Sequence, residues 1–131
     1  MQLLLFYDPA AGQGDFIPAS EGGIPAGQVK TYMGWRSNWK LIIPGSFGGS
    51  GYSGLLFYDG AGTGEFYEVN SQPEMTLLKT HTGWQSYGRP WTHIIPGDFW
   101  RPVDPHERNY TDLLFYAVPE QGHSTELVKA R

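Results

Sequence analysis

The stretch Leu55-Leu56-Phe57-Tyr58-Asp59 decides the fold, because the chain carries it three times. It stands earlier as Leu4-Leu5-Phe6-Tyr7-Asp8 and later, with its last residue changed, as Leu113-Leu114-Phe115-Tyr116-Ala117. A short continuous apolar run that ends in turn residues predicts a strand buried on both faces. A fixed period in a Gly-rich chain indicates the architecture before local propensities do. We therefore expect a tandem repeat built from strands.

A second group of residues recurs between the copies of this stretch. Gly34-Trp35 matches Gly83-Trp84. Further along, the run Trp39, Ile42-Ile43-Pro44-Gly45 and Phe47 matches the run Trp91, Ile94-Ile95-Pro96-Gly97 and Phe99. The chain is therefore expected to be a single repeat domain over residues 1–131, with units at about 3–47 and 54–99 and the first half of a third at 112–131.

Each full unit is expected to hold four short strands and no helix. In the second unit these are 55–58, 65–69, 75–81 and 91–95, and the Gly-rich segment 60–64 forms the hairpin turn between the first two. No segment shows an apolar period of 3.6 residues between helix caps. The predicted fold class is all-β.

The composition narrows the function classes. The 131 residues include 18 Gly, 10 Pro and no Cys, and the formal net charge is −4 without any run of Lys or Arg. Nucleic-acid binding is therefore not expected, and no apolar run is long enough to span a membrane. The apolar start has no basic flank and recurs inside the chain, so no signal peptide is visible. We expect a cytoplasmic location, or export by a route that needs no signal peptide.

The junction between the units carries a family resemblance. Pro96-Gly97-Asp98-Phe99, followed by Thr111-Asp112-Leu113-Leu114-Phe115-Tyr116, resembles the FG-GAP or VCBS repeat of integrin α-subunits and of several propeller lectins. The resemblance implies four-stranded propeller blades of about 50 residues. Two and a half blades are fewer than the roughly four needed to close a ring, so it also implies completion as a homo-oligomer. A fragment of a longer propeller and a small closed β-barrel are the alternatives.

The resemblance also raises the question of calcium. Those families place a run of Asp and Asn between the Phe and the Asp-Leu pair, where it binds the ion. The junction at 46–54 contains no carboxylate, and the second junction offers only Asp98, Asp104 and Asp112. We predict neither a metal site nor a cofactor, and calcium near Asp98 and Asp112 stays an open alternative.

The recurrent tryptophans are the first candidates for a binding site. Trp35 and Trp84 follow a Gly at a strand end, and Trp39 and Trp91 start the next strand, so each unit offers two indoles around one turn. The apolar C–H faces of sugar rings stack on indoles. The alternative is that these large aromatics pack between blades.

Polar residues near these tryptophans complete the predicted carbohydrate site. Arg36 follows Trp35 and Gln85 follows Trp84, and both can bind sugar hydroxyls. The turn acids Asp8 and Asp59 recur at the end of the first strand of each unit. Acids beside tight turns also bond nearby backbone amides for local reasons, which is the alternative for this pair.

Catalysis is not expected from this sequence. His81, His93, His106 and His123 form no metal-binding or nucleophile motif, and no phosphate-binding loop is present. His81 aligns with Tyr32, so we expect no histidine role that both units share. A propeller hydrolase or lyase is the least favoured function class.

The sequence favours a non-enzymatic, lectin-like protein that binds glycans or glycoconjugates. Its repeated shallow sites would give avidity in place of strong single-site affinity. The alternative is a protein-interaction or structural module without sugar binding. Its contact surface would be the loop Trp100–Tyr110, which is present in a single copy and dense in polar groups.

Overall fold

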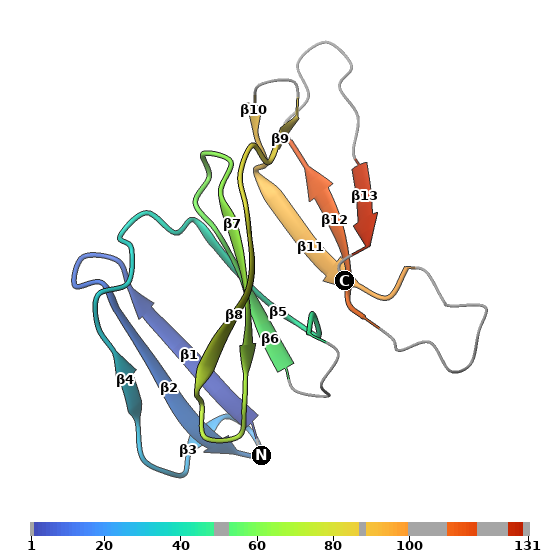
Figure 1. Cartoon of the computed structure of the whole chain (residues 1–131). Helices are drawn as coiled ribbons and strands as arrows, with labels where there is room; N and C mark the ends of the chain where they lie inside the picture. Colours follow the sequence, from blue (N-terminus) through green and yellow to red (C-terminus); the bar gives the residue numbers. More distant parts are fainter. Residues whose placement is uncertain (1, 49–52, 87–88, 100–109, 118–125, 130–131) are drawn as a thin grey trace. The chain divides into compact units, whose positions relative to one another are not determined.

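The computed structural model describes residues 2–48, 53–86, 89–99, 110–117 and 126–129 (Figure 1). These residues form strands and turns, and none of them lies in a helix, which confirms the predicted all-β class. A helical membrane span is accordingly not found in these ranges. The strands form antiparallel sheets, and none of the sheets closes within the described part of the chain. The chain divides into two compact units, Met1–Trp39 and Lys40–Arg131.

The first unit contains one four-stranded sheet. Strand β1 (Gln2–Asp8) pairs with β2 (Gln13–Ser20), and β3 (Ile24–Pro25) and β4 (Lys30–Tyr32) both pair with the other side of β2. Among the described residues, no strand pairs with the outer edge of β1.

The second unit begins with a four-stranded sheet in the order β5-β6-β7-β8. Its strands are β5 (Leu41–Gly45), β6 (Ser53–Tyr58), β7 (Gly64–Val69) and β8 (Met75–His81). In β6 every residue after Ser53 is buried, which confirms the strand predicted at 55–58 to be buried on both faces. The Gly-rich segment between β6 and β7 is the predicted hairpin turn.

The rest of the second unit forms a three-stranded sheet and a small two-stranded ladder. The three-stranded sheet has the order β11 (His93–Gly97), β12 (Asp112–Tyr116) and β13 (Glu126–Lys129). The ladder pairs β9 (Gln85–Ser86) with β10 (Arg89–Pro90).

The sheets are shifted by one strand relative to the sequence units. Strand β5 ends the first sequence unit but pairs with β6, the first strand of the next unit, and β11 pairs with β12 in the same register. The four strands that we expected within residues 54–99 therefore do not share one sheet, and the last of them begins at His93. The reason is local: the Trp84 N–H bonds the Gly62 carbonyl at 2.8 Å, so the chain leaves β8 across the end of the β6–β7 hairpin. The following strand therefore joins the next sheet.

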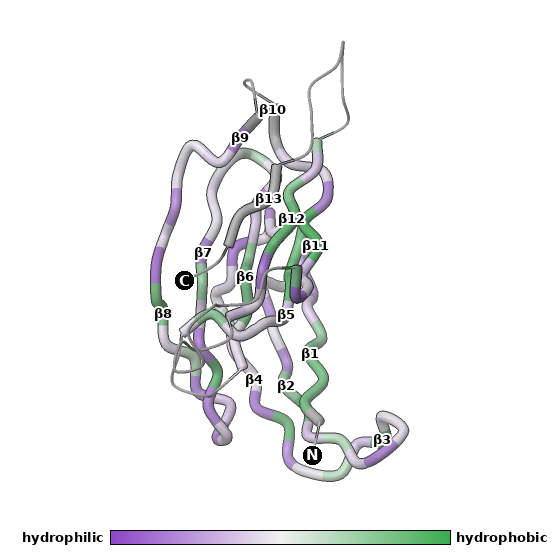
Figure 2. The backbone as a smooth tube through the Cα atoms, turned by 90° about the vertical axis from the view of Figure 1, so that its right-hand side faces the viewer, coloured by the Kyte–Doolittle hydropathy of each residue, from purple (hydrophilic) through white to green (hydrophobic). Residues whose placement is uncertain are grey.

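The core of the second unit lies between its two larger sheets. Successive side chains of a strand point to opposite faces of its sheet. We call the face that carries Leu56 and Tyr58 of β6 the first face, and the face that carries Leu55 and Phe57 the second face. The faces of the sheets that contain β1 and β12 are named by the equivalent residues. The first face of the β5–β8 sheet packs against the second face of the β11–β13 sheet. The buried cluster comprises Ile43, Phe47, Leu56, Tyr58, Phe66, Trp91, Ile94, Leu113, Phe115 and Ala117. In Figure 2 the hydrophobic colour follows β11 and β12.

Polar contacts join the same two sheets. The Tyr58 hydroxyl accepts the Trp91 N–H at 2.9 Å and donates to the Trp84 carbonyl at 2.9 Å. Burial raises the pKa of Tyr58, which keeps this hydroxyl protonated and able to donate. Ser46 and Thr111 also bond each other, through the Ser46 N–H and the Thr111 hydroxyl at 2.7 Å and through the Thr111 N–H and the Ser46 carbonyl at 3.0 Å.

Candidate functional site

An aromatic cluster stands at the end of β8 in the second unit. We call Phe66, His81 and Trp84 the second aromatic cluster. The His81 ring stacks on the Trp84 indole with a centroid distance of 4.6 Å and an interplanar angle of 16°. Phe66 meets both rings edge-on, at 5.6 Å from Trp84 and 5.7 Å from His81. Phe115 of the facing sheet adds an edge contact to Trp84 at 5.1 Å.

The first unit contains the same arrangement, with a tyrosine in place of the histidine. We call Phe16, Tyr32 and Trp35 the first aromatic cluster. Tyr32 stacks on Trp35 at 6.1 Å and 20°, and Phe16 meets both rings edge-on at 6.0 Å and 6.4 Å. The Lys30 ammonium lies 5.7 Å from the centre of the Tyr32 ring, a cation–π distance.

Glycines explain why the chain places each tryptophan there. Gly34 and Gly83 precede the two tryptophans with φ of 79° and 72°, a conformation that residues with a Cβ rarely adopt. Gly64 lies directly under Trp84, where a Cβ would come within 2.7 Å of the indole ring. The Trp35 N–H then bonds the Gly12 carbonyl at 2.9 Å, as the Trp84 N–H bonds Gly62. Each indole is thereby fixed over the hairpin turn of its own unit.

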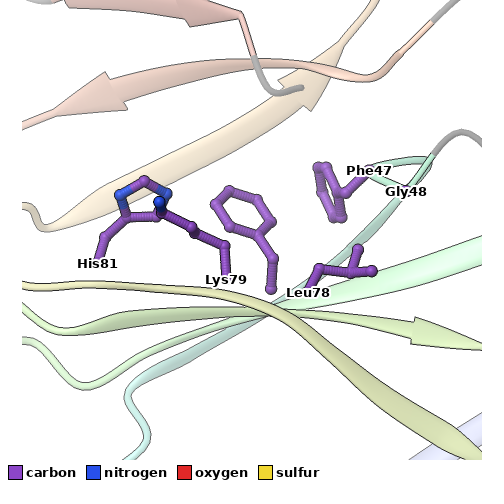
Figure 3. Close-up of a pocket in the computed structure, with 6 residues that line it drawn as sticks. Phe47, Gly48, Leu78, Lys79 and His81 are labelled. Carbon is purple, nitrogen blue, oxygen red and sulfur yellow. The ribbon is translucent and has the colours of Figure 1, made fainter.

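The second cluster borders a pocket of about 440 Å³ (Figure 3). The residues that line it are Phe47, Gly48, Phe66, Leu78, Lys79 and His81. In Figure 3 His81 stands at one end and Phe47 with Gly48 at the other. The pocket therefore combines an apolar wall with two polar side chains, Lys79 and His81.

The protonation of His81 follows from its surroundings. Burial lowers its pKa from the ordinary value of 6.5, and the charge of Lys79 lowers it further. The imidazole is therefore neutral at pH 7, with one nitrogen that donates and one that accepts a hydrogen bond.

Comparisons set this chain beside family models, curated proteins and solved structures. None of the three found a match. The site is therefore argued from the geometry of its own residues.

The predicted tryptophans divide into two pairs. Trp35 and Trp84 are half-buried members of the two clusters. Trp39 and Trp91 are only 8% and 7% exposed, which leaves little indole surface for a sugar ring. Trp91 belongs to the core, where it lies 5.3 Å from Phe115, so its geometry agrees with the packing alternative.

The predicted polar partners make other contacts. The Arg36 guanidinium lies 4.4 Å from the centre of the Trp39 ring, and the Gln85 amide donates to the Ala61 carbonyl at 3.0 Å. Both side chains are exposed, and neither lines the pocket in the second unit.

The turn acids serve their own hairpins. Asp59 is buried, and its Oδ1 accepts the N–H groups of Ala61 at 2.8 Å and Thr63 at 3.0 Å. Asp8 is exposed and accepts the Ala10 N–H at 3.1 Å. These contacts agree with the local alternative for both carboxylates.

Other acidic groups of the described ranges are also engaged. The Tyr67 hydroxyl donates to Glu65 at 2.7 Å, and burial together with this bond raises the pKa of Tyr67 to about 12. Asp112 accepts the Phe99 N–H at 2.8 Å. No group of three or more metal-ligating side chains occurs among the residues that the structure describes. Asp104, His106 and the predicted contact loop over residues 100–109 lie outside the described residues, as does His123.

Sequence reasoning missed Lys79 and the stacking role that Tyr32 and His81 share, although it aligns the two residues. The signal was present: Lys30-Thr31-Tyr32 precedes Gly34-Trp35 at the spacing with which Lys79-Thr80-His81 precedes Gly83-Trp84. The sequence predicts no histidine role that both units share, because the residue types differ. Tyr32 and His81 nevertheless occupy the same stacking position, since a planar ring is what the indole contacts.

Proposed function

We propose that this protein is a non-enzymatic carbohydrate-binding protein with one site at each aromatic cluster. The observation that carries the proposal is the recurrence of the set. Phe66, Lys79, His81 and Trp84 in the second unit correspond to Phe16, Lys30, Tyr32 and Trp35 in the first, and the ring contacts are the same. A surface made only for packing would not need an exposed lysine two residues before the stacked ring in both units.

The pocket beside the second cluster has the chemistry that a sugar needs. Its volume of about 440 Å³ falls within the roughly 300–1,000 Å³ that small-ligand sites occupy. Leu78, which is 38% exposed, offers apolar surface to the C–H face of a sugar ring, whereas Phe47 and Phe66 line the pocket with little exposed ring surface. The Lys79 ammonium donates to a hydroxyl oxygen, and the neutral His81 imidazole can both donate and accept.

The tryptophans take a supporting role in this proposal. Trp84 stacks on the His81 ring, and Gly64 and Phe115 in turn hold Trp84 in place. The sugar would contact the His81 side of the cluster, and the indole would hold that ring in place. Such preorganisation reduces the entropy lost when a ligand binds.

Two shallow sites on one chain favour a ligand with several sugar units. Each site alone offers few polar contacts, so its affinity is expected to be low. A branched or repeating glycan that reaches both sites binds with an effective concentration that raises the overall affinity.

The proposal is tested by glycan-array screening and then by titration calorimetry with the best-bound oligosaccharide. Lys30→Ala and Lys79→Ala each remove one donor, and loss of a charged hydrogen bond of about 1.5–3 kcal/mol weakens a site about tenfold or more. The double variant is expected to abolish detectable binding. Lys40→Ala is the matched control, because Lys40 is also exposed and belongs to neither cluster.

Two results would contradict the proposal. One is a folded protein that binds no glycan on the array, which would favour the interaction module. The other is a Lys30→Ala, Lys79→Ala double variant that binds its glycan as tightly as the wild type does.

A further inference from the structure

The core between the two sheets of the second unit is made by two different faces. The first face of the β5–β8 sheet contributes Ile43, Leu56 and Tyr58, and the second face of the β11–β13 sheet contributes Leu113 and Phe115. The contact is therefore head-to-tail, because unlike faces of the two sheets meet.

The same first face is present again on the β11–β13 sheet, where its residues are more exposed. Ile95 is the equivalent of Ile43 and pairs with Leu114, as Ile43 pairs with Leu56. Ile95 is 45% exposed, whereas Ile43 is 6% exposed. Leu114 and Tyr116 are half-buried, although their equivalents Leu56 and Tyr58 are fully buried.

The same second face is present on the sheet of the first unit. Leu4 and Phe6 of β1 are the equivalents of Leu113 and Phe115 of β12. Phe6 is 56% exposed, whereas Phe115 is 2% exposed. Leu4 is half-buried, and β1 shows the hydrophobic colour in Figure 2.

We propose that a second copy of this chain binds head-to-tail, with Ile95, Leu114 and Tyr116 of one copy packed on Leu4 and Phe6 of the next. The two sheet faces that meet within the second unit are thus both repeated on exposed surfaces of the chain. A large aromatic such as Phe6 is costly to leave in water and is a typical centre of a protein interface. The partner is a second copy of the chain, because the exposed residues are equivalent to the residues that form the contact within the second unit.

The two faces differ from each other, so one contact between two copies leaves one unlike face uncovered on each of them. A heterologous contact continues from copy to copy and ends either in a ring or in an open chain. This distinguishes the proposal from a symmetric dimer in which two β1 strands pair.

Light scattering after size-exclusion chromatography tests the proposal on the full chain. The wild type is expected to elute as an assembly larger than one chain. Phe6→Glu removes one face and Ile95→Glu removes the other, so each variant alone is expected to be monomeric, with association weakened about tenfold or more. Both side chains are exposed, and unchanged circular dichroism would show that the variants fold.

The decisive experiment mixes the two variants in equal amounts. The Phe6→Glu copy keeps the face of Ile95, and the Ile95→Glu copy keeps the face of Phe6, so the mixture is expected to form a complex of two chains that grows no further. Ile24→Glu is the control, because Ile24 is 63% exposed and lies on neither face.

Three results would overturn the proposal: a monomeric wild type, variants that assemble like the wild type, or a mixture that stays monomeric while both variants are folded. The inference does not depend on the proposed function, because none of its residues belongs to an aromatic cluster. Glycan binding could fail while assembly is observed, and assembly could fail while glycan binding is observed.

Discussion

Replacement of Gly64 by alanine tests the geometry that places Trp84. Gly64 does not have a positive φ, so alanine can adopt its backbone conformation and the effect is steric alone. The new Cβ would lie 2.7 Å from Cε3 and Cζ3 of Trp84, whereas carbon atoms in contact are about 3.5–4.0 Å apart. The indole must therefore move by about 1 Å.

Three neighbouring rings restrict the movement of the half-buried indole. His81 stacks on it at 4.6 Å, and Phe66 and Phe115 meet it at 5.6 Å and 5.1 Å. Overpacking of this kind costs about 1–3 kcal/mol. Alanine also reduces the entropy of the unfolded chain, which returns about 0.4–1 kcal/mol. We expect a net loss of about 0.5–2 kcal/mol in the free energy of unfolding.

Urea denaturation followed by tryptophan fluorescence measures this loss. The same substitution in a Trp84→Leu background is the control, because the ring that the Cβ would meet is then absent. We expect Gly64→Ala to be neutral or slightly stabilising there. If Gly64→Ala leaves both the free energy of unfolding and the fluorescence of the otherwise wild-type protein unchanged, Trp84 does not lie over Gly64.

Three further predictions concern His81, Asp59 and Gly14. The pKa of His81 is lowered in the folded chain, so the unfolded chain takes up a proton near pH 6.5 and the folded chain does not. The contribution of His81 to thermal stability is therefore expected to be full above about pH 7 and to fall below pH 6.5. His81→Tyr, which copies Tyr32, removes this component, and melting curves across the pH range check it. Asp59→Ala leaves two part-buried N–H groups without the carboxylate of buried Asp59 and should cost about 1 kcal/mol by urea denaturation, whereas Asp8→Ala at the exposed turn costs less. Gly14→Ala should lower the melting temperature, because its Cβ would overlap the Trp35 ring, and an unchanged value would refute that contact.

The strands could be predicted from the sequence because their signal is local. The run at 55–58 is apolar throughout and lies within β6, and the strand expected at 75–81 matches β8. The pairing across units could not be predicted in the same way. A sequence period shows that a strand recurs, but it does not show which strand pairs with it. Tertiary contacts such as the Trp84–Gly62 hydrogen bond determine that pairing.

The candidate site could be predicted in part for a related reason. Trp35 and Trp84 stood out because they recur as the same residue type. The stacking position beside them is filled once by Tyr32 and once by His81, which share a planar ring and little else. A comparison of residue types does not show that such positions share a role, whereas a comparison of ring geometry does.

The two proposals concern different residues and can be tested separately. Each unit carries an aromatic cluster, and the sheet of the first unit and the β11–β13 sheet expose unlike faces, the one with Phe6 and the other with Ile95. The Lys30→Ala, Lys79→Ala variant should therefore lose glycan binding and keep its assembly. The Phe6→Glu variant should keep the affinity of each site for a single oligosaccharide and lose only the added affinity for a surface that carries many glycans. If Phe6→Glu instead abolished binding of a single oligosaccharide in solution, the sites would depend on contact between copies, and their assignment to the two clusters of one chain would be wrong.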